Sequence, residues 1–241
     1  EVAQLAGMST DYYARLEQRR APQPSVQITT ALARALRLTL DERDHLFVLI
    51  GHNAPARFHT SDHVSPTLIR VLDRLHDCPA FVHTDLVETL AMNPLAVALL
   101  GDQTRHTGLS RSGFYRWFMD PAERLRYPEE TYESHGRAHA ARLRAALTAG
   151  SDTARAARIL AVLEERSPEF ARIWQLQEVA QRYEDCKTIV HPEVGPIDVD
   201  AQVLFTENRA QALVVLTTHP ATESAGKLEL RNTIGDQQLA R

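Results

Sequence analysis

Two histidines, His135 and His139, stand four residues apart, a spacing that places both imidazoles on one helical face and could hold a metal ion. Glu133 could join them, but no glutamate lies between them as in the HExxH motif of zinc enzymes. Residues 134–147 interleave arginine and histidine with alanine, a pattern typical of a solvated surface helix. We therefore expect an exposed histidine pair rather than a metal site.

Other chemical motifs are missing from the sequence. His52, His59 and His63 crowd a polar tract whose spacing matches no established set of metal ligands. There is no GxSxG, P-loop or GxGxxG segment. Cys78 and Cys186 lack CxxC spacing and cannot form a disulfide framework, which fits a reducing compartment. The sequence thus predicts no enzyme, no metal and no resident cofactor.

Composition and charge narrow the possible partners. The chain is 44% hydrophobic and 24% charged, with a formal net charge of −4. No apolar run approaches the roughly 20 residues that a membrane-spanning helix needs, and residues 1–18 lack the apolar segment of a signal peptide. We expect a cytoplasmic protein without a membrane partner. Because no strongly basic tract is present, any prediction of DNA binding depends on local geometry.

An early cationic cluster could supply that geometry. Arg15 could donate two hydrogen bonds to a guanine, and Asp11 could accept one from a cytosine amino group. Arg19 and Arg20 would contact phosphates, which position a protein without reading sequence. From periodicity alone, the same residues could equally form the solvated face of a helical bundle. The candidate DNA-binding residues are Ser9, Thr10, Asp11, Tyr12, Arg15, Arg19 and Arg20.

Short helices must position these side chains. Val2–Ala6 has the apolar spacing of a helix, and Gly7 follows where a left-handed cap is needed. Ser9 is a suitable N-cap for a second helix that turns Tyr13 and Leu16 inward. The connection between the two helices is the tight turn of a helix-turn-helix.

Two more helices complete a small bundle. Pro22 and Pro24 end the second helix. Ser25 caps a third helix, and Asp41 caps a fourth that ends at Gly51.

The string Val2–Gln18, followed by Pro22 and Pro24–Ser25, resembles the XRE-type, lambda-repressor-like helix-turn-helix family. The resemblance implies that the helix beginning near Ser9 is a recognition helix and that double-stranded operator DNA is a partner. Such proteins commonly bind two half-sites, so we expect a homodimer. The chain begins inside the family's second helix, and we expect the first helix to be missing from it.

The rest of the chain mixes strands and helices. A linker at 57–79 contains a helix opened by Ser65 and Pro66. Two short strands, Phe81–Val82 and Thr89–Met92, precede a helix at Pro94–Leu100 and a helical region at 114–183.

Two later segments have the patterns of further strands of the predicted sheet. Ile197–Phe205 alternates apolar and polar residues, whereas Leu213–Leu216 is apolar on both faces and should be a central strand. We predict an α+β chain with five antiparallel strands and helices inserted between the second and third. The predicted domains are a DNA-binding domain at 1–56, the linker and its helix at 57–79, and a ligand-binding domain at 80–241.

The order of elements after the linker resembles the ligand-binding domain of MmyB-like transcription regulators, which has a PAS-like fold. The resemblance implies a pocket for a small hydrophobic ligand, with a fatty acid as the best-supported class. It depends on Asn93, Tyr115–Pro121, Tyr127-Pro128, Leu143–Ala145, Ser167–Phe170 with Trp174, Lys187 and His191–Gly195.

A helix-covered antiparallel sheet can enclose such a pocket. Arg116 or His191 would serve as the polar partner of a ligand carboxylate. Each apolar candidate could equally be ordinary core, and the second domain could instead be a ligand-free dimerisation or protein-interaction module. The candidate lining residues are Phe81, Leu90, Met92, Leu95, Leu99, Trp117, Phe118, Trp174 and Val203.

Overall fold

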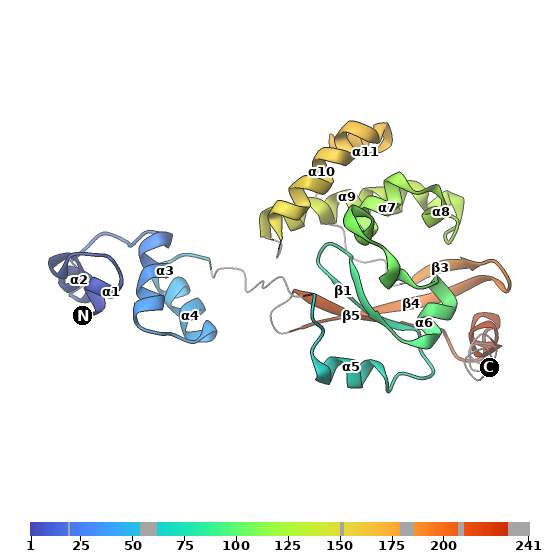
Figure 1. The fold of residues 1–241 in the computed structure, drawn as a ribbon, viewed down its shortest axis with the longest axis horizontal. Helices are drawn as coiled ribbons and strands as arrows, with labels where there is room; N and C mark the ends of the chain where they lie inside the picture. Colours follow the sequence, from blue (N-terminus) through green and yellow to red (C-terminus); the bar gives the residue numbers. More distant parts are fainter. Residues whose placement is uncertain (19, 54–61, 150–151, 179–185, 207–209, 231–241) are drawn as a thin grey trace. The chain divides into compact units, whose positions relative to one another are not determined.

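The computed structural model describes residues 1–18, 20–53, 62–149, 152–178, 186–206 and 210–230. The chain divides into two compact units, Glu1–Arg57 and Phe58–Arg241. Figure 1 shows the first unit as helical and the second as a sheet with helices. The predicted α+β class is confirmed.

The first unit contains four short helices among its described residues, as the sequence predicts. Two predicted caps are confirmed, because Ser9 accepts a hydrogen bond from the amide of Tyr12 and Ser25 accepts one from the amide of Ile28. Gly7 turns the chain between the first two helices with a φ of +65°. The helices are α1 (Val2–Leu5), α2 (Thr10–Glu17), α3 (Val26–Ala35) and α4 (Leu40–Ile50).

The N-cap of α4 differs from the predicted one. The hydroxyl of Thr39 accepts a hydrogen bond from the amide of Glu42 at 3.3 Å, and the Glu42 carboxylate accepts one from the Thr39 amide at 2.8 Å. This reciprocal capping box satisfies two backbone donors at once. The prediction that Asp41 caps this helix was wrong. Thr39 and Asp41 are both good N-cap residues, and Glu42 stands three residues after Thr39, where it can complete a capping box with it. Asp41 lies in the first turn instead.

Phe47 of α4 is buried in the core of the first unit, with 1% of its surface exposed. Tyr13 and Leu16 are half-buried on the inner side of α2. They line one wall of a groove of about 390 Å³. The walls contributed by α3 and α4 include Leu32, Leu36, Leu46 and Ile50.

The second unit is built on a five-stranded antiparallel sheet with the strand order β2-β1-β5-β4-β3. The central position of β5 confirms the prediction from its two apolar faces. Along β4, Ile197 and Val199 are buried whereas Asp198 is exposed, as the alternating pattern predicts. The strands are β1 (Ala80–Thr84), β2 (Thr89–Met92), β3 (Cys186–His191), β4 (Gly195–Phe205) and β5 (Gln211–Thr217).

Helices between β2 and β3 gather on one side of this sheet, and α5 lies on the opposite side (Figure 1). Four of the helices begin with proline directly after a capping side chain, namely Ser65, Asn93, Asp120 and Ser167. A further helical segment covers residues 223–230. The named helices are α5 (Pro66–Leu72), α6 (Pro94–Leu100), α7 (Gly113–Met119), α8 (Pro121–Arg124), α9 (Tyr132–Ala149), α10 (Thr153–Arg166) and α11 (Pro168–Trp174).

Three apolar clusters hold these layers together. Leu95 of α6 packs with Val199 on one face of the sheet, and Leu72 of α5 packs with Val82 on the other. The third cluster lies among the helices α7, α9, α10 and α11. Its buried members include Phe114, Leu143, Ile159, Leu163, Phe170 and Ile173.

Candidate DNA-binding helix and candidate ligand-binding residues

The N-terminal part of α2 presents most of the predicted DNA-binding residues to solvent. Thr10, Asp11 and Arg15 are exposed, whereas Tyr12 is half-buried. The hydroxyl of Ser9 already accepts a backbone hydrogen bond as the N-cap. Ser9 therefore fixes where the helix begins, and the residues after it determine which side chains face outward.

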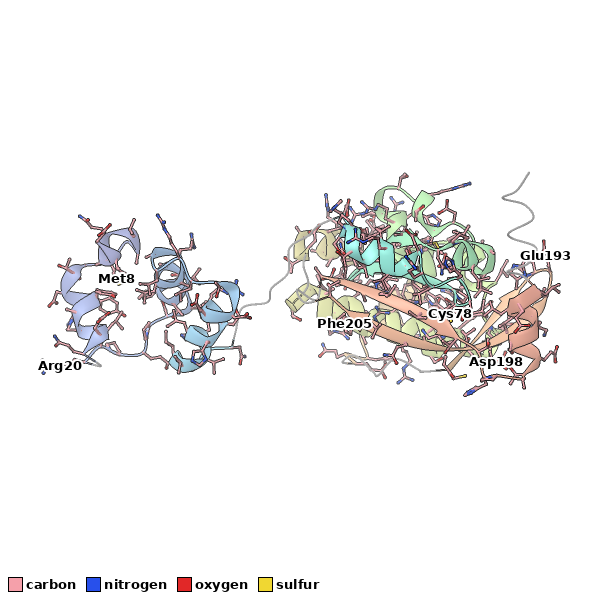
Figure 2. All side chains as sticks on the ribbon, turned by 90° about the horizontal axis from the view of Figure 1, so that it is seen from below. Met8, Arg20, Cys78, Glu193, Asp198 and Phe205 are labelled. Carbon is pink, nitrogen blue, oxygen red and sulfur yellow. The ribbon has the colours of Figure 1, made fainter. Side chains whose placement is uncertain are left out.

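Weak local interactions hold Arg15. Its Nη2 lies 3.5 Å from Oδ2 of Asp11, and the two side chains are 54% and 82% exposed. Its guanidinium carbon lies 6.0 Å from the ring centre of Tyr12. Exposed ion pairs contribute about 1 kcal/mol at most, so Arg15 can exchange this pair for another partner. Arg20 is exposed and extends away from the helices (Figure 2), and Arg19 lies outside the described residues.

Arg116, one of the two predicted partners for a ligand carboxylate, is buried in α7 and 4% exposed. Its Nε donates to Oε2 of Glu123 at 3.0 Å, and its Nη2 donates to Oε1 of Gln103 at 3.1 Å. Its Nη1 donates to the carbonyl oxygens of Ser110 and Arg111 at 2.7 and 2.8 Å. All three nitrogens of the guanidinium therefore bind protein atoms, and Arg116 ties α7 to the segments around it.

His191, the other predicted partner, is also engaged. Its Nδ1 accepts a hydrogen bond from the amide of Glu193 at 3.2 Å, and its Nε2 lies 3.2 Å from the carbonyl oxygen of Ala98. Glu193 marks the turn between β3 and β4 in Figure 2. His191 thus connects this turn to α6.

The predicted lining residues are distributed over all three clusters. Leu95, Leu99, Phe81 and Val203 lie in the cluster on the α6 face of the sheet, whereas Leu90 packs in the cluster on the α5 face. Trp117 of α7 is buried, and its ring contacts that of Tyr132. Phe118 and Trp174 pack against the helical cluster. Met92 is half-buried, and its sulfur accepts a hydrogen bond from the amide of Gln103.

The expectation of an exposed pair at His135 and His139 was wrong. Both imidazoles face the indole of Trp117, with ring centres 5.3 and 5.2 Å from it. His139 also contacts Phe114 edge-on at 5.6 Å, and His135 contacts Tyr127 at 4.7 Å. The histidines are therefore part of an aromatic contact between α9 and α7.

Small residues bring this face of α9 inward. Gly136 is so close to α7 and α11 that an added Cβ would lie 3.4 Å from Nε1 of Trp117 and 3.1 Å from Cδ1 of Ile173. Ala140 is 2% exposed. The arginines of α9 do not all face solvent. The guanidinium of Arg144 lies 4.0 Å from the ring centre of Trp174 and donates a hydrogen bond to the backbone carbonyl oxygen of Trp174. The alanines thus pack inside, and this explains why the pattern was misread.

The environment keeps these histidines neutral. Burial lowers the pKa of His135 to about 4, and the positive charge of Lys187 adds to the effect. Burial, followed by the charge of Arg142, lowers the pKa of His139 well below its usual value. His83 on β1 was missed by the sequence analysis, and its pKa falls to about 4 for the same two reasons. Its Nδ1 lies 2.6 Å from the carbonyl oxygen of Thr84.

We call Trp117, Tyr127, Tyr132, His135 and His139 the Trp117 cluster. The rings of Tyr127 and Tyr132 lie edge-on to Trp117 at 5.6 and 5.9 Å. The guanidinium of Arg124 lies over the indole at 5.3 Å. In the described part of the chain, Nε1 of Trp117 and Nδ1 of His139 are buried without a hydrogen-bond partner. The spacing of His135 and His139 was the available signal for this cluster, and the interpretation of residues 134–147 as a solvated surface helix hid it.

Within the described ranges, no group of three His, Cys, Asp or Glu side chains is placed to hold a metal ion. Among the helices that the structure describes, none is both long and apolar enough to cross a membrane.

A helical unit with an exposed arginine on its second helix precedes a helix-covered antiparallel sheet, and the family matches of the two parts support a DNA-binding transcription regulator with a ligand-binding domain. Residues 64–230, more than half of the chain, match the family described as MmyB-like transcription regulator ligand binding domain, and the chain belongs to this family. Residues 1–46 match the family described as helix-turn-helix domain. No curated protein matches the chain.

Proposed function

We propose that the protein reads a specific operator sequence through α2. The observation that carries this proposal is the exposed, weakly paired guanidinium of Arg15 on the second helix of the helix-turn-helix. The first residues of such a helix meet base edges in the major groove, where Arg15 can donate two hydrogen bonds to a guanine. Asp11 would accept from a cytosine amino group, and Arg20 would contact a phosphate.

In this proposal the protein acts in the cytoplasm as a homodimer, without catalytic activity. The test is selection of bound duplexes from a random-sequence pool with the full chain, followed by sequencing. Two related half-sites with centres about one helical turn apart, or a multiple of that distance, would support a dimeric reader. Recovery of duplexes without a shared motif would contradict sequence-specific binding, and a lone half-site would contradict the dimer.

For the second unit we propose binding of a small hydrophobic ligand of the fatty-acid type, with no other cofactor. Membership of a ligand-binding family supports this proposal. Native mass spectrometry of freshly purified protein tests it, since a bound mass in the fatty-acid range is expected. If the ligand regulates DNA binding, each must change the affinity of the other by the same factor. Equal operator affinity with and without saturating ligand would exclude this switch.

A ligand-free interaction module is the alternative for the second unit. Leu204 and Phe205 near the end of β4 favour it, because they are 49% and 60% exposed. Phe205 is labelled on this strand in Figure 2. A dimer mass without an additional small molecule would favour this alternative. A variant with serine at both positions should then become monomeric, whereas the sensing proposal expects its ligand content to be unchanged.

A further inference from the structure

The first described residues of the second unit, Asp62, His63 and Val64, form a segment that we call the entry strap. Each residue of the strap is held by a different element. The Asp62 carboxylate accepts a hydrogen bond from Nη1 of Arg111 at 2.9 Å, and the His63 carbonyl oxygen accepts one from Nε2 of Gln211 at 3.0 Å. Val64 is 8% exposed and packs in the cluster on the α5 face of the sheet. The chain reaches the strap from the first unit, so these contacts fix where the connection is attached to the second unit.

Arg111 stands between two carboxylates of different exposure. Its Nη1 binds Asp62, whose side chain is 67% exposed, whereas its Nη2 lies 3.7 Å from Oε2 of Glu88, whose side chain is 5% exposed. The close partner of Glu88 is Arg155 of α10, which donates from Nε to Oε1 at 2.5 Å. Nη2 of Arg155 also donates to the carbonyl oxygen of Gly108 at 2.7 Å. Because Arg155 serves the buried carboxylate, Arg111 can serve the exposed one.

The backbone of Glu88 is fixed, so its carboxylate must find partners where it stands. Its amide donates to Oγ1 of Thr84 at 3.3 Å, its carbonyl oxygen accepts from the Thr84 amide at 3.0 Å, and it forms a β-bridge with Ser112. A buried carboxylate that loses its cation is far more costly than a broken exposed ion pair. Without Arg155, both oxygens of Glu88 need donors, and the two Nη atoms of Arg111 can supply them as a fork. Such a fork takes Nη1 away from Asp62.

We propose that Arg111 is a switch between two positions, controlled by Arg155 of α10. While Arg155 binds Glu88, Arg111 holds Asp62 and ties the entry strap to the segment before α7. When α10 shifts and withdraws Arg155, Arg111 closes on Glu88 and releases Asp62. In a regulator, this device reports the position of α10 to the chain that leads to the DNA-binding helices. That use rests on the proposed sensing function, whereas the switch itself does not.

The test follows the carboxyl carbon resonance of Asp62 by NMR near neutral pH, in the full chain with isotope-labelled aspartate. Asp62→Asn assigns the resonance, and Arg111→Met gives its position when the carboxylate has no partner. Arg155→Met should move the resonance to this unpaired position. Adding Glu88→Gln to Arg155→Met removes the charge that attracts Arg111, so the resonance should return to the wild-type position. Arg158→Met is the matched control, because Arg158 is an exposed arginine of the same helix.

Thermal unfolding first establishes which variants are folded. If Arg155→Met does not fold, Arg155→Gln takes its place, because glutamine keeps an N–H donor for the carbonyl oxygen of Gly108. Movement to the unpaired position in the Arg155 variant, reversed by Glu88→Gln and absent in Arg158→Met, supports the switch. A resonance that stays at the wild-type position in the Arg155 variant overturns it, as does one that Glu88→Gln fails to return. These measurements use neither DNA nor ligand, so a negative result leaves operator reading and fatty-acid sensing to their own tests.

Discussion

Arg155 of α10 and Glu88 beside β2 are 67 positions apart and joined by a hydrogen bond of 2.5 Å between Nε and Oε1. The Glu88 side chain is 5% exposed. Arg111 approaches the same carboxylate at 3.7 Å and donates to Asp62 at 2.9 Å. Asp62 precedes the first strand, so Glu88 links the segment that enters the second unit to the helical layer.

Replacing Glu88 by Gln should therefore destabilise the second unit. The change leaves the guanidinium of Arg155, which is 19% exposed, without its charged partner. We expect a loss of about 1–3 kcal/mol in the free energy of unfolding, measured by urea denaturation. Glu133→Gln is the control, because its pair with Arg172 is about half exposed and should contribute less than about 1 kcal/mol. Equal losses in the two variants would contradict this ranking.

Replacing Arg15 by Ala should weaken specific DNA binding. Loss of a bidentate contact to guanine costs about 1–3 kcal/mol and relaxes the preference at that base pair. Fluorescence anisotropy with the selected operator, and with a duplex altered at one position, measures both effects. Arg105→Ala in the second unit removes an exposed arginine paired with Asp102 and should bind as the wild type does. Unchanged affinity and preference in Arg15→Ala would refute the predicted contact.

Replacing Arg116 by Met should lower the stability of the second unit, because Arg116 contacts protein atoms and not the ligand. Glu123 is 13% exposed and would lose the Nε contact, although Arg126 also pairs with it. We expect a loss of about 3 kcal/mol, because removal of one partner leaves a buried charge poorly compensated. Urea denaturation measures the loss, and native mass spectrometry reports the bound ligand. A variant of wild-type stability that has lost its ligand would restore Arg116 as the carboxylate partner.

The neutral histidines predict acid sensitivity. His83 and His135 have pKa values of about 4 in the folded protein against a usual value of 6.5. Between these values the unfolded chain binds protons that the folded chain does not, so stability is full above pH 6.5 and is lost as pH falls toward 4. Urea denaturation at about pH 7 and about pH 5 should show the decrease.

Two variants separate the cause of this acid sensitivity. His135→Phe should reduce the dependence on pH, because it removes one of the buried groups that must bind a proton on unfolding. His219→Asn should leave it unchanged, since His219 is 77% exposed. Constant stability of the unaltered protein across this range would show that the histidines are not held neutral.

Elements with strong local signals could be predicted from the sequence alone. Ser9 and Ser25 are good N-caps before apolar spacing, and both cap helices in the structure. The helix Pro94–Leu100 has the predicted bounds because Asn93 and Pro94 define its start and Gly101 follows its last residue. The alternation along β4 also predicted its buried face, since neighbouring residues of a strand point to opposite faces.

Tertiary structure decided which polar residues are buried and what they contact. Composition around His135 and His139 suggested solvent, but Gly136 and Ala140 allow α9 to approach α7 and bury that face. The sequence suggested that Arg116 is available to a ligand. In the folded unit its guanidinium donates instead to the Glu123 carboxylate and to the carbonyl oxygen of Ser110 in the preceding turn. Helix caps and strand alternation depend on neighbours within a few residues, which the sequence contains. The partners of a buried side chain come from distant segments, so they are defined only when the helices pack on the sheet.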